Sequence, residues 1–400
     1  MATDRLSAFP DRVLQCVVSH LSVSDAVRTS LLSLRWRTLW RQGDAVNLDS
    51  EDYDDGDDDG VRAGRELFRD ALAAVGADGR RPVRRLSIVV FSGFQRDFVR
   101  GIMRTTPGMD AILATPAIKR LEELRLDLSS EFCPAYDVYT LPASRVPCWS
   151  LRLLELKGCT LGPRGAAAPF GRLETLKLVS CKSSLEGLQA MLDGAPNLVG
   201  LWLEHVIFTA EELGSDWHAV MSKRRLLLCC PHATVSVTVM HCHRTGGLDI
   251  DAPSVRSLRY TGLLEHFPFS SATPKYPSGE TPPHALFWES IGRFSRLRVL
   301  KLVLLDINDI AVRSEEEDVF LKVFPDLKFL ELQGSLEVHS HGAAVAIANL
   351  LLCCPAIQEF HLKCKLHGDL YSSFKRTMPQ SDEKKSPVGP RKIHRITQEA

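Results

Sequence analysis

The clearest pattern along the chain is an apolar sextet, L-x-x-L-x-L, that recurs over its central and C-terminal parts. Copies begin at positions 121, 151, 173, 198, 297 and 327, and a variant with Ile357, Phe360 and Leu362 follows. Neighbouring copies start 30 residues apart from 121 to 151, 22 from 151 to 173 and 25 from 173 to 198. Apolar sextets repeated at such intervals predict a solenoid in which each repeat contributes one short parallel strand.

The copy from Leu151 to Leu161 matches the longer consensus L-x-x-L-x-L-x-x-C-x-L at every fixed position, which is the signature of leucine-rich repeats. Alternate strand residues are expected to point into the core and out to a concave face. Cys159 and Cys181 stand where the chain turns toward the convex side, each as a small buried group. Weaker copies near 235–239 and 255–258 leave the repeat boundaries between 204 and 296 open.

Helices are predicted between the strands, on the convex side. Residues 184–192 have helical periodicity and stop at Asp-Gly-Ala-Pro, and residues 343–352 stop at Cys-Cys-Pro. A buried parallel α/β sheet would also alternate strands with helices, but the repeated sextet favours the solenoid. Five prolines between 267 and 283 predict a loop insertion. The residues from 374 onward, rich in Lys, Arg, Ser and Pro, predict a disordered tail.

The N-terminal segment follows a helical period instead. Pro10 and Asp11 suit the first turn of a helix. Ser22 can open a second helix in a capping box with Asp25, and Ser33 can cap a third helix that carries two tryptophans. Residues at i+3 and i+4 spacing give the first helix a broad apolar stripe: Val13, Leu14, Val17, Val18 and Leu21.

An acidic segment, residues 49–60, follows these helices. Its density of like charge prevents packing and predicts a flexible linker, although an acidic bait for a basic partner would have the same composition. A helix over 61–74 and a strand over 83–90 then lead into the repeats. Three short helices in about 40 residues are near the lower size for an independent core. Because the linker cannot cover their apolar stripe, the module is expected to bind another protein by helix packing.

Composition narrows the choice of partners and compartment. The chain has 400 residues and a formal net charge of +0, so nothing favours nucleic acid or an anionic membrane as a partner. No apolar run reaches the roughly 18 residues that a membrane span needs, and the polar start does not resemble a signal peptide. The eleven cysteines do not suit the disulfide framework of a small secreted domain. We therefore expect reduced cysteines and a cytoplasmic or nuclear protein.

Candidate chemistry is sparse. The segment His241-Cys242-His243 lies near Cys229, Cys230 and His232, but this spacing matches no usual zinc site. No nucleotide-binding, hydrolase or metalloprotease motif is present, and the acidic run 315–318 is expected to be a solvated helix start. The sequence therefore predicts no metal, no cofactor and no catalytic residues.

The N-terminal segment closely resembles an F-box of the plant type that precedes leucine-rich repeats. The matching residues run in order over the whole segment: Asp4-Arg5-Leu6-Ser7, Phe9-Pro10-Asp11, Val13-Leu14, His20-Leu21, Asp25 to Ser30, Leu32-Ser33, Arg35-Trp36-Arg37 and Leu39-Trp40. Two residues depart from the family pattern: Phe9 stands where leucine is usual, and Leu34 where a basic residue is usual. The resemblance implies a module that binds the Skp-type linker of a ubiquitin ligase and, through it, a cullin. By this analogy the contact residues are Pro10, Leu14, Val17, Val18, Leu21, Val27 and Leu31.

We therefore expect an α/β protein with an N-terminal three-helix F-box (4–48), an acidic linker (49–60), a leucine-rich-repeat solenoid (61–373) and a tail (374–400). The expected function is that of a non-catalytic adapter, which holds a target protein near activated ubiquitin. Strand alternation predicts that the target contacts outward-pointing residues of the concave face: Glu155, Lys157, Thr175, Lys177, Trp202, Glu204, Lys301 and Glu331.

Three alternatives remain open at this point. A binding scaffold whose F-box no longer engages a ligase would have the same repeats, and linker binding separates it from the adapter. A receptor in which a small molecule completes the target surface would need a deep pocket with basic residues, which the sequence does not locate. An enzyme would need a nucleophile and base, and no such pair is visible.

Overall fold

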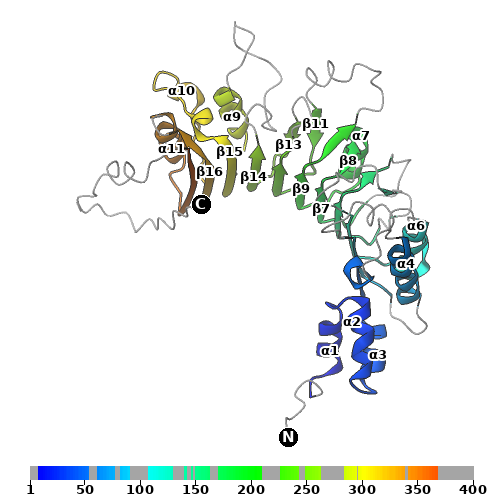
Figure 1. Ribbon diagram of the computed structural model, residues 1–400. Coiled ribbons are helices and arrows are strands. Elements are labelled where there is room, and N and C mark those ends of the chain that lie inside the picture. The colour runs from blue at the N-terminus through cyan, green and yellow to red at the C-terminus, as the bar shows by residue number, and fades with distance from the viewer. Residues whose placement is uncertain are drawn as a thin grey trace. The chain divides into compact units, whose positions relative to one another are not determined.

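The computed structural model describes residues 8–53, 61–76, 82–90, 107–128, 139–141, 146, 149–162, 170–209, 226–242, 248–262, 283–294, 296–337 and 341–367. Within these ranges the chain is a mixed α/β protein that begins with helices and continues as parallel sheet (Figure 1). It divides into two compact units, residues 1–211 and 212–400.

Unit 1 opens with the helical module: α1 (Asp11–Val18), α2 (Val23–Arg28), a 3-10 turn (Thr29–Leu31) and α3 (Trp36–Gln42). Pro10 is the N-cap residue of α1. The Ser22 hydroxyl accepts a hydrogen bond from the Asp25 backbone N–H at 3.2 Å, so its predicted capping role is confirmed. The predicted cap at Ser33 is wrong. Arg35 holds the N-cap position of α3 and no side chain caps that helix.

The parallel sheet of unit 1 runs in the order β1-β2-β3-β5-β7-β9. The strands are β1 (Ala45–Asp49), β2 (Arg85–Val89), β3 (Glu123–Asp127), β5 (Leu153–Lys157), β7 (Thr175–Val179) and β9 (Gly200–Glu204). The leucines of each sextet lie in register, as in the row Leu124, Leu154, Leu176 and Leu201, whose members are at most 2% exposed. Burial alternates along every strand, so these leucines form the core and their neighbours an open face.

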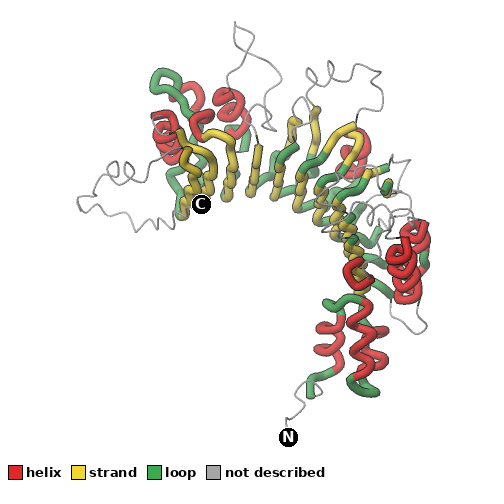
Figure 2. Tube along the Cα trace, viewed as in Figure 1, coloured by secondary structure: helices red, strands yellow, loops and turns green. Residues whose placement is uncertain are grey.

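The remaining elements of unit 1 lie behind the sheet, where Figure 2 shows helices on one side of the strands. They are α4 (Val61–Val75), α6 (Pro107–Ala114), α7 (Leu185–Asp193), 3-10 turns at Ser50–Tyr53 and Pro116–Ile118, and a small parallel sheet of β4 (Thr140–Leu141), β6 (Thr160–Leu161), β8 (Lys182–Ser184) and β10 (Ile207–Thr209). Cys159 and Cys181 are fully buried at the turns between the two sheets, as predicted. Burial raises the pKa of the Cys181 thiol to about 11, so it stays neutral.

Unit 2 repeats this arrangement, with parallel strands in the order β12-β14-β15-β16-β17. The strands are β12 (Ser236–Met240), β14 (Ser257–Gly262), β15 (Val299–Asp306), β16 (Phe329–Glu337) and β17 (Glu359–His367), and a separate pair joins β11 (Leu226–Cys229) to β13 (Leu248–Asp251). The helices are α9 (Pro283–Ile291), α10 (Glu317–Phe320) and α11 (His341–Leu352), with a 3-10 turn at Ile307–Ile310. The strands thus confirm the sextet prediction and the two weaker copies.

The boundary between the helical module and the repeats differs from the expectation. β1 pairs along its whole length with β2, from Ala45 opposite Arg85 to Asp49 opposite Val89. The parallel sheet therefore begins inside the range assigned to the helices, and the start of the expected linker is ordered as the turn Ser50–Tyr53. Pro283, the last residue of the expected loop insertion, opens α9. Residues 54–60, 267–282 and 374–400 lie outside the described residues.

Candidate partner-binding surfaces

The helical module has a small core of its own. Leu14, Val18, Ala26, Trp36 and Leu39 are at most 7% exposed and pack together, with Leu21 and Trp40 partly buried against them. Leu14 and Val18 were expected to touch the partner. Their side chains are only 1% and 4% exposed, so we assign both to the core that supports the surface.

Large apolar side chains cover the outside of the same module. Leu31, Leu34 and Leu32 are 87%, 76% and 65% exposed, and four further residues lie between 41% and 47%. These four are Phe9, Val13, Val17 and Val27. Small soluble modules rarely expose so many large apolar groups unless a partner covers them. We call these seven residues the apolar surface of the helical module.

Arg35 fixes one corner of the apolar surface. It precedes α3, yet its guanidinium lies 2.6 Å from the Asp11 carboxylate and donates to the Phe9 carbonyl at 2.6 Å. These contacts tie the start of α3 to the start of α1. A guanidinium that binds a carboxylate and a carbonyl together has little freedom to move, so the corner is held in one geometry.

The other end of α1 is attached to the sheet. The Asn47 amide on β1 donates to the Ser19 carbonyl at 2.9 Å and to the Leu21 carbonyl at 3.0 Å. Arg85 on β2 donates to the Ser19 hydroxyl and to Asp44, each at 3.0 Å. Asn47 thus supplies donors to two carbonyl groups at the end of α1, where a helix leaves its carbonyls without intrahelical partners.

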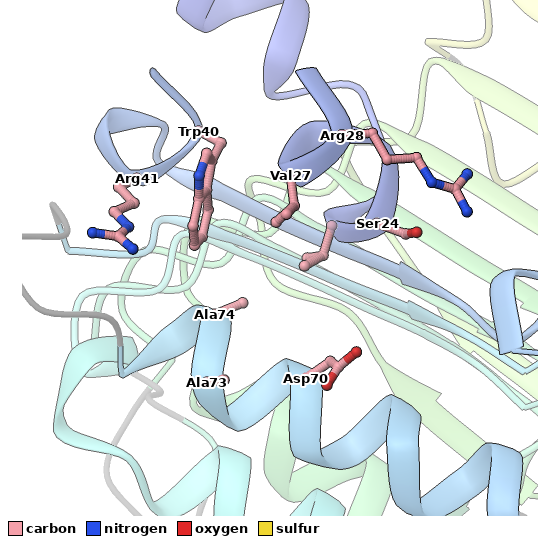
Figure 3. A pocket seen from close by; sticks show the side chains of 9 residues that line it. Ser24, Val27, Arg28, Trp40, Arg41, Asp70, Ala73 and Ala74 are labelled. Carbon is pink, nitrogen blue, oxygen red and sulfur yellow. The ribbon is translucent and has the colours of Figure 1, made fainter. Parts of the chain in front are cut away.

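A pocket of about 610 Å³ lies between the module and α4. Val23, Ser24, Val27 and Arg28 line it from α2, Trp40 and Arg41 from α3, and Asp70, Ala73 and Ala74 from α4. Figure 3 shows Val27 and Trp40 extending toward α4. Val27 therefore belongs both to this pocket and to the apolar surface.

The open face of the unit 1 sheet carries six of the eight residues expected to contact the target, each half-buried. Neighbouring strands pair their charges across this face. Lys157 lies 2.7 Å from Asp127, and Lys177 lies 2.9 Å from Glu155. The Lys177 ammonium also lies 5.0 Å from the centre of the Trp202 ring, whose N–H donates to Glu204 at 2.9 Å. Thr175 lies on the same face.

The open face of unit 2 holds a charge cluster centred on Glu331. Its carboxylate lies 3.3 Å from the Lys301 ammonium and 3.0 Å from that of Lys363. Burial alone would raise the pKa of Glu331, but the two lysines outweigh it and hold the pKa below its usual value. Lys301 also lies 5.1 Å from the centre of the Phe329 ring. All eight residues predicted for the target therefore lie on open strand faces.

Sequence reasoning missed several residues of these surfaces. Val13 was placed on the apolar stripe but not among the partner contacts, and Leu32 and Leu34 were not recognised as surface groups. Spacing could have found Val13, which lies four residues before Val17 on the same helix face. Lys363 could have been found from the register of the last sextet. It lies opposite Gln333, which is two residues after Glu331 on the same face of β16.

The remaining candidate from the sequence is the His/Cys segment at 241–243. Cys242 is buried and donates to its local Met240 carbonyl, while His243 lies outside the described residues. Across the described ranges, no three His, Cys, Asp or Glu side chains are grouped so that they could hold a metal ion. No helix within those ranges is long and apolar enough to cross a bilayer.

Comparison with known proteins supports both parts of the chain. Residues 6–44 match the F-box domain, and residues 109–261 match the leucine-rich repeats of the FBD-associated F-box protein At5g56370. The chain is 26% identical over 281 residues to the putative F-box/LRR-repeat protein At5g54820 of Arabidopsis thaliana, covering 66% of this chain and 53% of that protein.

Two further relatives match shorter parts of the chain. The F-box/LRR-repeat protein At1g55660 of Arabidopsis thaliana is 28% identical over 260 residues, 64% of each chain. The MEIOTIC F-BOX protein MOF of Oryza sativa subsp. japonica is 29% identical over 235 residues, 48% of this chain and 49% of that protein. The chain thus spans between about half and two thirds of the length of these three relatives. The two domain matches and these relatives confirm the resemblance of this chain to plant F-box proteins with leucine-rich repeats.

Proposed function

We propose that this chain is a substrate adapter of a Skp–cullin–F-box ubiquitin ligase. Its helical module would bind the Skp-type linker protein, and its repeats would bind the target. The observation that carries the proposal is the apolar surface of the module, because seven large apolar side chains lie exposed on a segment that matches the F-box domain. A module that works without a partner would not be expected to expose so much apolar surface.

The adapter would contact the linker through side chains that are accessible in the free chain. Of the residues expected by analogy, Pro10, Val17, Val27 and Leu31 are exposed and Leu21 is half-buried. Val13, Leu32 and Leu34 extend the same surface. Leu14 and Val18 would act indirectly, by keeping the helices in place.

The mechanism is proximity rather than chemistry. The adapter would hold a lysine of the target near the activated ubiquitin, which raises the effective concentration of the two reactants. The open strand faces would supply the target contacts, and the half-buried, paired charges at Glu155, Lys177 and Glu331 suit a polar protein surface. Such a complex would work in the cytoplasm or nucleus, where cullin ligases are assembled.

Isothermal titration of the full chain with a Skp-type linker protein tests the proposal. Tight binding by the wild type should weaken at least tenfold in the double variant Leu31→Ala/Leu32→Ala, since each buried leucine contributes about 1.5–3 kcal/mol. The matched control is Leu305→Ala/Leu352→Ala, which removes two leucines that are each 68% exposed in unit 2. This control should bind the linker as the wild type does.

Failure of the folded wild type to bind any Skp-type linker would overturn the proposal. The better account would then be a leucine-rich binding scaffold that does not engage a ligase. The departures Phe9 and Leu34 favour testing this alternative, because both are exposed on the apolar surface. The variant Leu34→Arg introduces the basic residue that is usual in the family. Linker binding by this variant but not by the wild type would show that Leu34 has cost the surface its partner, whereas equal binding by both would show that the surface tolerates Leu34.

A further inference from the structure

The residue directly before each strand forms a column along one edge of the sheet in each unit. In unit 1 this column is Asp44, Arg84, Glu122, Arg152, Glu174 and Val199, joined by backbone hydrogen bonds of 2.7–2.8 Å from each N–H to the preceding carbonyl. The charges alternate in sign without exception from Asp44 to Glu174. Arg84 lies 3.3 Å from Glu122, and Arg152 forms a two-pronged pair with Glu174 at 3.0 and 2.9 Å. Neighbouring charges in unit 1 therefore neutralise one another.

The same column in unit 2 is built differently. Arg256, Arg298 and Lys328 precede β14, β15 and β16, which lie side by side (Figure 1). The Arg298 N–H donates to the Arg256 carbonyl at 2.8 Å, and the Lys328 N–H to the Arg298 carbonyl at 2.9 Å. Val235 and Gln358 flank them, so the column contains three cations and no carboxylate. We call Arg256, Arg298 and Lys328 the cation column.

The cation column lacks internal partners. All three side chains are exposed, and no ion pair or side-chain hydrogen bond connects them to another residue in the part of unit 2 that the structure describes. Adjacent strands lie about 4.8 Å apart, so three like charges are confined to a length of about 10 Å. Like charges opposite one another in a sheet are unfavourable. The equivalent positions in unit 1 carry charges of alternating sign, whereas the charged positions in unit 2 are all positive.

Nearby residues leave the balance positive. Arg293 and Arg296 lie in the turn that leads to β15, Asp326 lies in the turn that leads to β16, and the exposed Glu359 begins β17 opposite Phe329. Two cations and two carboxylates therefore surround the three cations of the column. The half-buried Val299 and Phe329 follow Arg298 and Lys328 directly on the open face. A ligand along this edge would thus meet cations, with apolar side chains beside them.

We propose that the cation column binds an acidic segment of the target protein. In an extended segment, side chains on one face recur about every 6.6–6.8 Å, so two carboxylates fit the length of the column. Nucleic acid is a poorer match, because its affinity depends on many phosphate contacts and the chain as a whole has a formal net charge of +0. The inference rests on the target-binding half of the proposed function and is independent of linker binding.

Fluorescence anisotropy of the full chain with a labelled poly-glutamate peptide tests the inference. The wild type should bind this peptide and should not bind a poly-glutamine peptide of equal length. Arg298→Ala/Lys328→Ala should weaken binding of poly-glutamate by about tenfold, given the modest strength of exposed ion pairs. Added salt should reduce the affinity of the wild type more than that of the variant.

The matched control is Arg84→Ala/Arg152→Ala. It removes two cations from the same register in unit 1 and changes the net charge equally, yet it should leave peptide binding unchanged. Equal binding by the column variant and the wild type would overturn the inference, as would equal loss in the control. Tighter, column-dependent binding of a single-stranded DNA homopolymer would also overturn it, in favour of nucleic acid.

Titration of the same proteins with the Skp-type linker separates this inference from the proposed function. Linker binding should survive Arg298→Ala/Lys328→Ala, because the column lies outside the F-box helices. A chain that binds poly-glutamate through the column but never binds the linker would overturn the ligase adapter and leave the column as a binding site. A chain that binds the linker but not the peptide would overturn the inference alone.

Discussion

Leu14 offers the sharpest test of how the helical module is built. Resemblance to the F-box family placed it among the partner contacts, whereas it is 1% exposed and belongs to a five-residue core. Leu14→Ala removes this buried side chain and leaves a cavity. Such substitutions cost about 2–5 kcal/mol, as the lost burial adds to the cost of the cavity.

The expected loss is as large as the stability that the module can have. Natural domains have about 0.05–0.15 kcal/mol of stability per residue, so the roughly 30 residues from α1 to α3 would supply only about 2–5 kcal/mol. We therefore expect Leu14→Ala to unfold the module locally while the repeats stay folded. Hydrogen exchange should show lost protection over α1 to α3 and unchanged protection in β5 and β7.

Leu31→Ala is the matched control, because it removes the same side chain from a position that is 87% exposed. Its protection pattern should equal that of the wild type, while its affinity for a Skp-type linker falls. The reasoning would be refuted if Leu14→Ala kept full protection over α1 to α3 and lost only linker binding. Leu14 would then be a direct contact, and the packing described above would not represent the free module.

Three further predictions follow from the contacts. Asn47→Ala should leave the Ser19 and Leu21 carbonyls without this donor, cost about 1–2 kcal/mol and speed amide exchange at the end of α1; unchanged exchange would contradict it. Glu331 has a folded-state pKa below the reference value of 4.5, so it stabilises unit 2 above that pH and loses this contribution as pH falls through the folded pKa. Thermal melts should therefore show a smaller acid-induced loss for Glu331→Gln than for the wild type, and parallel curves would disprove the assignment. Alkylation of the native chain should modify the exposed Cys16 while sparing Cys159, which is fully buried and has a raised thiol pKa; early modification of Cys159 would contradict its position.

The repeats were predictable because their signal is local. Each L-x-x-L-x-L copy specifies a strand and the face that it buries, so the seven predicted sextets correspond to β3, β5, β7, β9, β15, β16 and β17. The helix predicted over 61–74 is α4 (Val61–Val75), and that over 184–192 is α7 (Leu185–Asp193). Periodicity within a few residues decides such elements.

The first strand was not predictable in the same way. Residues Ala45–Asp49 have the alternation of a strand but no sextet, and they follow directly on helices. Their pairing partner β2 begins 40 residues later, at Arg85 opposite Ala45. Only the folded sheet supplies the hydrogen bonds that make this segment a strand.

Local patterns along the chain were enough to assign the class of the protein: a helical module with an F-box pattern, followed by leucine-rich repeats with a defined inward and outward face. The apolar residues that form the core of the module become clear only in the folded chain, since Leu14 and Leu31 have the same side chain and differ only in what packs around them. Tertiary structure also decided which charges meet, because Arg152 and Glu174 are 22 residues apart and become neighbours only through the register of the sheet. Periodicity is a property of the local chain, whereas burial and ion pairing depend on contacts between distant segments.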